Sequence, residues 1–296
     1  MAQRSPDILS NPGFQRRFFF LAKRFVAGET IDSAIEAVLA LNARGLSATL
    51  DFLGEDVLRE SDAAQTTATY VDMIERIGAS RADANVSVKL SAIGQAVDED
   101  LAFANLRTII EKARSRAMFV RLDMEGSSTV DSTYRLCDRA RSEYEHVGPV
   151  VQAYLHRALA DTQRHVVQHT RVRLCKGAYK EPQAVAFQAM PKIRENYLQL
   201  ARLLLAQGTY PGIATHDDRL IEAVKAFTRA ERIGPERFEF QMLYGIRPEK
   251  QRAIVAEGYR MRVYVPFGTH WAGYFYRRLA ERKENVFFVL RGIFSR

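Results

Sequence analysis

The stretch from residue 264 to 285, YVPFGTHWAGYFYRRLAERKEN, holds two adjacent arginines and a nearby glutamate. Arg277 and Arg278 follow a strand-like run and a Pro-Phe-Gly turn, on a segment with a helical pattern. Two neighbouring guanidinium groups can hold a small carboxylate through several charge-assisted hydrogen bonds. Glu281 shares their helix face and can fix one arginine in position. A solvated helix with an ordinary ion pair explains the same residues, since exposed pairs are common and stabilise little.

The composition is that of a globular chain with an excess of positive charge. Its 296 residues are 47% hydrophobic and carry a net charge of +8. The basic residues are scattered, without a Lys/Arg block, so we expect no nucleic-acid partner and keep nucleic-acid binding only as a minor alternative. Cys137 and Cys175 are too few for a disulfide scaffold, which favours a reducing cytosol. No apolar run is long enough to cross a bilayer, so we expect a cytoplasmic protein, at most attached peripherally to the membrane.

The order of apolar runs and helical segments predicts one barrel domain. Eight short runs, each ending in polar residues, alternate with amphipathic stretches: SATLDFL (47–53), NVSVKLS (85–91), MFVRLDME (118–125), GPVVQAYL (148–155), RVRLCKGAY (171–179), PGIATHD (211–217), RFEFQMLYG (237–245) and MRVYVPFG (261–268). Strands buried on both faces and joined by helices form parallel sheets. The fold class is therefore α/β, a closed (βα)8 TIM-type barrel of about 250 residues.

We divide the chain into a helical leader, residues 1–45, packed on the barrel, and a catalytic barrel, residues 46–296, with a final helix that carries the paired arginines. Thr30 is the expected N-cap of the second leader helix. Between the strands, helical segments are expected at 99–114, 130–144, 192–207, 219–232 and 248–257. A doubly wound sheet is disfavoured, because neither a GxGxxG nor a GxxxxGK[ST] motif follows any strand.

Charged and polar residues gather at the ends of seven runs, where barrel enzymes hold their chemistry. Each alone has a structural explanation: Lys89 or Arg173 can be an ion-paired layer residue with Asp123 as its partner, and His216 a hydrogen-bonded core histidine. Packing alone would prefer apolar side chains there, so together they predict an active site. With the two arginines of the last helix, cations outnumber carboxylates, which predicts a positive mouth for a carboxylate or phosphates. The residues at the run ends are Lys89, Asp123, Glu125, Gln152, Arg173, Lys176, Thr215, His216, Asp217, Gln241 and Tyr264.

No metal site is expected. His165 and His169 have a spacing that can bind zinc on a helix, but no third ligand is evident and a solvated helix face explains them. Cys175 has no base-like neighbour in sequence and is expected to be inert packing.

The motifs resemble those of the proline dehydrogenases, FAD-dependent (βα)8-barrel enzymes, and the chain looks like their short, monofunctional bacterial form. The resemblance covers nearly the whole chain in order. The matching segments are SVKLS (87–91), RLDME (121–125), QAYL (152–155), RLCKGAY (173–179), ATHD (214–217), FEFQMLYG (238–245), YVPFGTHW (264–271) and YRRLAERKEN (276–285).

The resemblance implies oxidation of L-proline to Δ1-pyrroline-5-carboxylate, with hydride transfer to N5 of FAD and onward electron transfer to a quinone. This is the first step of proline catabolism to glutamate, so a pyrroline-5-carboxylate dehydrogenase would act next. A quinone acceptor makes a peripheral contact with the membrane an expectation for the basic, aromatic N-terminus or the last helix, although a solvated face explains those residues equally.

Roles follow by motif from the same resemblance. Arg277, Arg278 and Lys89 would hold the proline carboxylate. Glu281 would orient an arginine, while Tyr264 and Leu243 would pack against the ring. Asp123 would belong to the active-site charge network, and Arg173 would lie beside flavin N5. The flavin would be held by Met124, Gln152, Arg173, Lys176, Gly177, Ala178, Thr215, His216 and Gln241.

Other functions stay open from the residues. Oxidation of 4-hydroxyproline is a close variant, against which Tyr264 argues by filling the space of the hydroxyl group. A Schiff-base barrel aldolase would use Lys89 or Lys176 as its nucleophile. A basic barrel that binds without catalysis is the third alternative.

Overall fold

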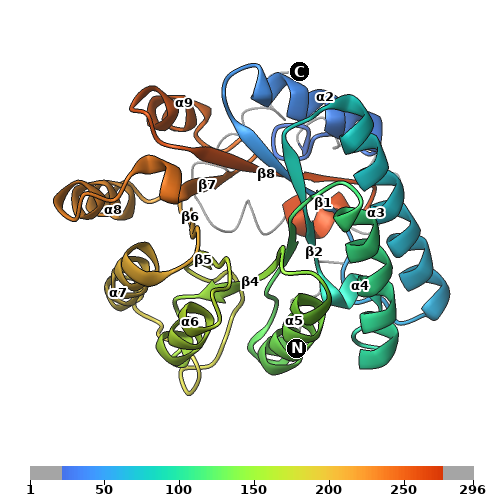
Figure 1. Ribbon diagram of the computed structural model, residues 1–296. Helices are drawn as coiled ribbons and strands as arrows, with labels where there is room; N and C mark the ends of the chain where they lie inside the picture. Colours follow the sequence, from blue (N-terminus) through green and yellow to red (C-terminus); the bar gives the residue numbers. More distant parts are fainter. Residues whose placement is uncertain (1–21, 276–296) are drawn as a thin grey trace, which may run out of the picture.

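Eight parallel strands form a closed barrel in the computed structural model, which describes residues 22–275 (Figure 1). Each strand pairs with the next along the chain, and β1 pairs with β8 to close the ring. The strands are β1 (Ser47–Phe52), β2 (Ala84–Val88), β3 (Val120–Leu122), β4 (Val147–Gln152), β5 (Arg173–Cys175), β6 (Gly212–Ala214), β7 (Glu239–Leu243) and β8 (Met261–Phe267). The predicted (βα)8 barrel is confirmed, because every predicted run overlaps one of these strands, and no strand starts more than one residue before its run.

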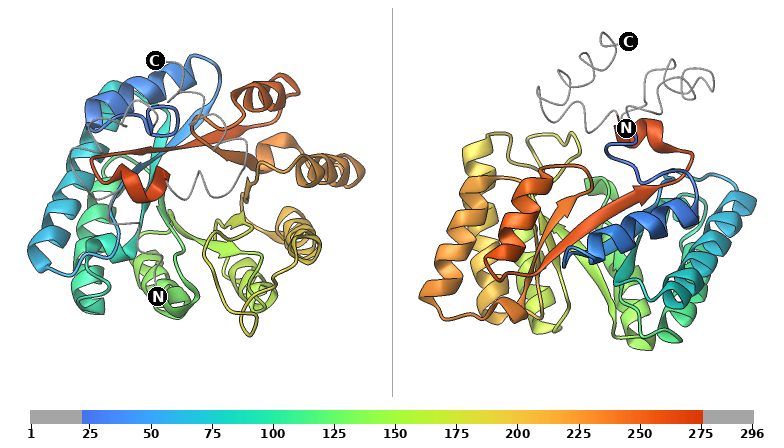
Figure 2. Two further views of the ribbon diagram at one scale, coloured as in Figure 1. Left: turned by 180° about the vertical axis from the view of Figure 1, so that it is seen from behind. Right: turned by 90° about the horizontal axis from the view of Figure 1, so that it is seen from above.

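Helices surround the strands on the outside of the barrel (Figures 1 and 2). They are α2 (Ile31–Asn42), α3 (Glu60–Ser80), α4 (Glu99–Arg114), α5 (Val130–Glu143), α6 (Ala158–Val167), α7 (Met190–Gln207), α8 (Asp218–Ala230) and α9 (Pro248–Ala256), with 3₁₀ turns at Leu90–Ile93, Ser127–Thr129 and Pro235–Arg237. Local chemistry sets several helix starts. Thr30 caps α2 in a reciprocal capping box, as predicted, and the Asp98 carboxylate accepts from the Leu101 amide at the start of α4.

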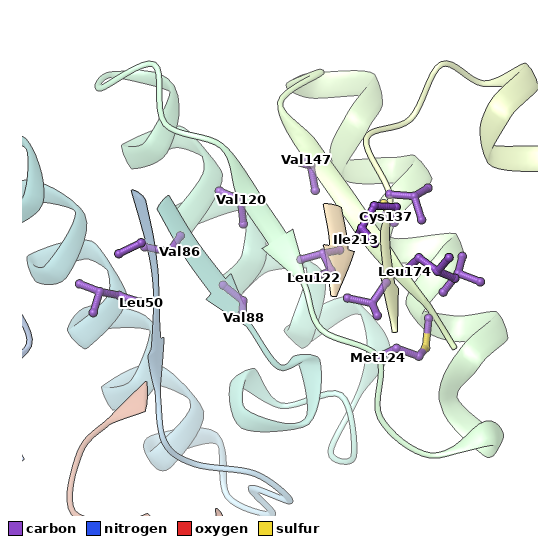
Figure 3. Packing of buried hydrophobic residues seen from close by; sticks show 14 of the residues in the cluster. Leu50, Val86, Val88, Val120, Leu122, Met124, Cys137, Val147, Leu174 and Ile213 are labelled. Atoms are coloured by element: carbon purple, nitrogen blue, oxygen red, sulfur yellow. The ribbon is translucent and has the colours of Figure 1, made fainter. Parts of the chain in front are cut away.

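The main apolar core lies between the strands and the helices. Leu50, Val86, Val88 and Val120 belong to this layer, and none of them has exposed surface (Figure 3). Because successive strand residues point to opposite faces, the residues between these positions point into the barrel. They include Asp51, Ser87 and Arg121, all buried. The barrel axis is therefore lined by polar and charged side chains rather than by the branched apolar residues usual in such barrels.

The chain before β1 closes one side of the barrel. Helix α2 packs against both β1 and β8. Backbone bonds tie the preceding segment to the end of β8, from the Ala27 amide to the Pro266 carbonyl at 2.9 Å and from the Gly268 amide to the Gly28 carbonyl at 3.0 Å. Near the carboxyl ends of the strands, apolar side chains from residues 22–26 form a second cluster with those from residues 271–275, which follow β8 (Figure 2).

Candidate active site

A cavity of about 490 Å³ opens at the carboxyl ends of the strands. Charged groups lie at its base, and aliphatic, sulfur-containing and aromatic side chains form its walls. Its lining consists of Lys89, Asp123, Met124, Val150, Arg173, Cys175, Lys176, Gly177, Ala178, Tyr179, Met190, Ile193, Ala214, Thr215, His216, Gln241, Met242, Leu243, Tyr264 and Tyr274. An open groove of about 670 Å³ also runs along α3 and α4, but its Lys112 and Glu75 are already paired, so the strand-end cavity is the better candidate.

A network of buried ion pairs lies at the base of the cavity. The Lys89 ammonium donates to both carboxylate oxygens of Asp51, each at 2.8 Å, and lies 3.9 Å from Asp123 Oδ2. Arg173 Nη1 donates to Asp123 Oδ1 at 2.7 Å. The Tyr264 hydroxyl donates to Asp123 Oδ2, also at 2.7 Å, and accepts from Lys89 at 3.4 Å. Asp123 thus joins the two cations and the tyrosine into one unit.

The electrostatics of this network keep Lys89 and Asp123 ionised. Burial acts to lower the pKa of Lys89, but the Asp51 and Asp123 carboxylates outweigh it and place that pKa above its ordinary value. Burial acts to raise the pKa of Asp123, but Arg173 and Lys89 outweigh it and lower that pKa. Burial and the two carboxylates raise the pKa of Tyr264 well above its usual value, so its hydroxyl remains a neutral donor. The site presents a fixed ammonium and a fixed guanidinium beside an aromatic wall.

A second line of polar side chains holds Arg173 from the side that faces away from the cavity mouth. Its Nε donates to Gln241 Oε1 at 2.6 Å, and Gln241 Nε2 donates to Glu239 Oε1 at 2.6 Å. Glu239 also accepts from Arg262 Nε at 2.8 Å. All four side chains lie inside the barrel and are largely buried, so the loss of a hydrogen-bond partner there is costly.

The sequence matches the family model of proline dehydrogenase over residues 34–291. It is 44% identical over 275 residues to proline dehydrogenase 1 of Bacillus subtilis subsp. natto, covering 93% of this chain and 91% of that protein. It is 43% identical to proline dehydrogenase of Deinococcus radiodurans, covering 94% and 92% of the two chains. The chain belongs to the proline dehydrogenase family.

The proline dehydrogenase fold is also found within longer proteins. The crystal structure of proline utilization A from Bdellovibrio bacteriovorus, inactivated by N-propargylglycine, superposes with a TM-score of 0.85 at 26% identity. The match covers 96% of this chain but 35% of that one, so the present chain spans about a third of its length. The resemblance to the proline dehydrogenases is therefore confirmed by sequence and by fold. In the part of the chain that the structure describes, no helix combines the length and the apolar character needed to span a membrane.

Most residues that the proline dehydrogenase resemblance assigned to the site come together. The predicted substrate residues Lys89, Leu243 and Tyr264 line the cavity, as do all predicted flavin residues except Gln152. Gln152 is buried at the end of β4, where its Nε2 donates to the Glu125 carbonyl at 3.2 Å. Arg277, Arg278 and Glu281 lie outside the described residues. The structure brings the cavity-lining residues together, and the role of each one stays a prediction.

Local contacts shape the predicted flavin side of the cavity. Lys176 Nζ lies 3.4 Å from Asp217 Oδ2, which also accepts from Arg194 Nε at 2.7 Å. Gly177 has a φ of +110°, and a Cβ there would lie 2.3 Å from the Tyr154 ring, so this position requires glycine.

His216 and Glu125 are held by neighbouring groups rather than placed freely at the cavity. His216 Nε2 accepts from the Leu243 amide at 2.9 Å, which fixes the ring with that nitrogen unprotonated. The predicted run-end residue Glu125 accepts from the Ser91 hydroxyl at 2.6 Å and does not line the cavity.

The cations that line the described part of this proline dehydrogenase site are each paired with a carboxylate. Lys89 pairs with Asp51, Arg173 with Asp123, and Lys176 with a third carboxylate. The predicted net positive charge of the mouth stays a prediction, because Lys176 and Arg194 share one carboxylate and Arg277, Arg278 and Glu281 lie outside the described residues.

Sequence reasoning missed Asp51, Ser87 and Glu239. Polar residues occupy every second position of β1, at Ser47, Thr49 and Asp51. This period-two pattern marks an inward face and is visible in the sequence. The same alternation would have found Glu239 beside Gln241 on β7.

The expectation that both histidines lie on a solvated helix face was wrong for His165 and for the extent of the helix, while His169 is exposed. Helix α6 ends at Val167, and His169 follows it with a φ of +52°, so the two rings are not one helical turn apart on a helix. His165 has no exposed surface and packs edge-on against Tyr134, with ring centroids 4.7 Å apart, instead of facing solvent.

Burial raises the pKa of the Cys175 thiol to about 12, which agrees with inert packing.

Proposed function

We propose that this chain catalyses the FAD-dependent oxidation of L-proline to Δ1-pyrroline-5-carboxylate. The reaction removes a hydride from the ring carbon next to nitrogen and a proton from the nitrogen, leaving a C=N bond. The observation that supports it most strongly, together with the family, is the ionised Lys89–Asp123–Arg173 network at the base of a carboxyl-end cavity. Bound FAD would supply the two-electron acceptor.

The residues present fit a flavin on the β4–β7 side of the cavity. Gln152 Oε1 is a buried acceptor without a hydrogen-bond partner within residues 22–275, and a flavin ring offers N–H donors. Gly177 and Ala178 leave the backbone accessible, and Lys176 brings a cation for phosphate groups. We propose that these residues hold FAD with Met124, Arg173, Thr215, His216 and Gln241.

The substrate half of the site follows from charge and shape. Lys89 presents an ammonium for the proline carboxylate, and its bond to Asp51 fixes that ammonium in place. Tyr264 and Leu243, which pack against the same apolar cluster, would form the wall against the proline ring. We assign the remaining carboxylate contacts to Arg277 and Arg278, with Glu281 orienting one of them. Anchoring the carboxylate orients the ring for hydride transfer.

Asp123 and Arg173 serve as the catalytic charge pair in this proposal. Asp123 accepts from Arg173, Tyr264 and Ser87, so it sets the relative positions of the groups beside substrate and flavin. Such fixed charges need no reorganisation when charge moves during the reaction, which lowers the barrier.

The wider cellular role is also proposed from the family. Electrons would pass to a quinone, with peripheral contact at the inner face of the cytoplasmic membrane, and a pyrroline-5-carboxylate dehydrogenase would consume the product in the cytoplasm.

For the domain organisation we propose a helical leader, residues 1–45, and a catalytic barrel, residues 46–296, within a single domain.

A lysine-based aldolase that uses Lys89 as its nucleophile is disfavoured by the state of this side chain. A Schiff-base nucleophile must be an unprotonated amine, whereas the carboxylates around Lys89 raise its pKa above the ordinary value. Oxidation of 4-hydroxyproline is disfavoured because a hydrogen bond to Asp123 holds the Tyr264 ring in place.

The visible spectrum of the purified protein, before and after anaerobic L-proline, tests the proposal. Oxidised-flavin bands that bleach with proline would support cofactor, substrate and reaction class together. Bands that persist with proline would refute the substrate and direct attention to 4-hydroxyproline. A folded protein that stays colourless after added FAD would refute the flavin reaction.

A further inference from the structure

A line of polar side chains runs from the cavity down the barrel axis through Arg173, Gln241 and Glu239. Gln241 Oε1 accepts from Arg173 Nε, and Gln241 Nε2 donates to Glu239 Oε1, both at 2.6 Å. Arg262 Nε donates to the same Glu239 oxygen at 2.8 Å. Arg173 borders the cavity, whereas Glu239 and Arg262 do not.

The bonding capacity of each group fixes the orientation of the Gln241 amide. A guanidinium can only donate hydrogen bonds, so Arg173 requires the amide oxygen to face it. An ionised carboxylate can only accept, so Glu239 attracts the NH2 end. Burial acts to raise the pKa of Glu239, but Arg262 outweighs it and lowers that pKa, so the carboxylate is ionised. Reversing the amide would place donor against donor and acceptor against acceptor.

Gly212 on β6 provides the space that the amide occupies. A Cβ at this position would lie 2.4 Å from Gln241 Nε2 and 2.8 Å from Gln241 Cδ. These atoms are the far end of a flexible side chain, so an alanine would displace the amide without moving the strands. Strand β6 pairs with β7 here, with Gly212 opposite Glu239 in the register.

We propose that Glu239 is a positioning residue that fixes Arg173 through Gln241, and that Gly212 keeps the space for this contact. Among the described residues, Arg173 otherwise keeps the bonds from Nη1 to Asp123 and to Ser87, at 2.7 and 3.2 Å, and the Tyr264 ring, whose centroid lies 5.3 Å from its Cζ. Both bonds come from one nitrogen, so they do not fix the rotation of the guanidinium about it once Nε is released. The inference rests on the proposed function in that Arg173 acts beside substrate and flavin.

Gly212→Ala is the main test, because it touches no ion pair, and Glu239→Gln tests the other side of the amide. Tyr144→Phe is the control for a general loss of stability: it removes the bond from the Tyr144 hydroxyl to the Met118 carbonyl, which touches none of these side chains. The first readout is the ¹⁵N–¹H resonance of Arg173 Nε in the protein without substrate, assigned by its loss in Arg173→Lys. The second readout is kcat and KM for L-proline, with thermal stability measured in parallel.

Gly212→Ala and Glu239→Gln are expected to shift or broaden the Arg173 Nε resonance and to lower kcat on the order of tenfold, the loss expected for one charge-assisted hydrogen bond. Tyr144→Phe should leave both readouts near those of the parent protein. An unchanged resonance in Gly212→Ala would overturn the proposal, even if Glu239→Gln fails to fold. Equal changes in Tyr144→Phe and Glu239→Gln would also overturn it, since a general loss of stability would then explain them. If the protein does not oxidise proline, the proposed function fails, while the resonance still decides whether Gln241 holds Arg173.

Discussion

The Lys89 ammonium and the Asp51 carboxylate form a two-oxygen ion pair inside the barrel, with both oxygens 2.8 Å from Nζ. Asp51 has no exposed surface, and Lys89 lies at the cavity with 7% of its surface exposed. The pair therefore presents a lysine to the cavity while its counter-charge lies behind it. Asp51 thus controls the position of a proposed substrate-binding group without lining the cavity.

Replacing Asp51 by asparagine should destabilise the protein. Among the described residues, Lys89 would keep the Asp123 carboxylate, 3.9 Å away, and the neutral Tyr264 hydroxyl at 3.4 Å, so a buried charge would lose its main partner. Breaking such a pair costs about 3 kcal/mol of the free energy of unfolding. Urea denaturation measures this loss. The double variant Asp51→Asn/Lys89→Met should recover part of it, and a double variant no more stable than the single one would contradict the ion-pair explanation.

Tyr264→Ser should change the substrate preference. The smaller side chain removes the ring that would occupy the space of a 4-hydroxyl group, together with the hydroxyl that donates to Asp123 at 2.7 Å. We expect the ratio of kcat/KM for 4-hydroxyproline to that for proline to rise about tenfold. Tyr264→Phe keeps the ring and is the control. An equal rise in both variants would mean that the hydrogen bond, rather than the ring, sets the preference.

Lys176→Ala should weaken flavin retention. Lys176 is the proposed cation for the flavin phosphates, and loss of one charge-assisted contact raises the dissociation constant about tenfold. Flavin absorbance after gel filtration at decreasing protein concentration measures the change. The control is Lys192→Ala on α7, whose ammonium pairs with Glu195 at the surface. Full flavin retention in Lys176→Ala would assign the phosphates to other residues.

The buried His165 should make stability depend on pH. Burial, aided by the neighbouring charge of Arg164, lowers the pKa of His165 from 6.5 to about 4, although Gln168 slightly favours the charged ring. Because the unfolded chain binds the proton more readily, stability should be full above pH 6.5 and fall as the pH decreases towards 4. The total loss is about 3 kcal/mol.

Chemical denaturation across this pH range measures the effect. His165→Leu should flatten the dependence, whereas replacing the half-exposed His146 by glutamine should leave it in place. A dependence that survives His165→Leu would assign the titration to another group.

The barrel could be predicted because its signals are local. Helix α4 has the predicted bounds, since Asp98 caps its start and apolar residues recur along one face. Helix α3 was not among the predicted stretches, because its threonines and glycine weaken the helical pattern. Strand ends differ by a few residues: the run 171–179 contains only the short β5, Arg173–Cys175, after which the chain turns at the cavity.

The site could be predicted only in part, because its bonds join distant strands. Lys89, Asp123 and Arg173 were predicted to lie at one mouth from their positions at strand ends. That Lys89 pairs first with Asp51, 38 positions away, depends on the register of two strands and is not visible in either segment alone. The orientation of Gln241 likewise requires three strands in place.

Helix α2 binds a surface that is made by the first and the last strand of the barrel. Residues 27 and 28 are bonded to positions 266 and 268, so these contacts cannot form on the ribosome until nearly the whole barrel has been synthesised. The apolar side of α2 must stay uncovered or be protected during translation, and final closure is a late, long-range event. Synthesis that stalls before β8 would therefore leave this helix without its docking surface, a species prone to aggregation or capture by chaperones.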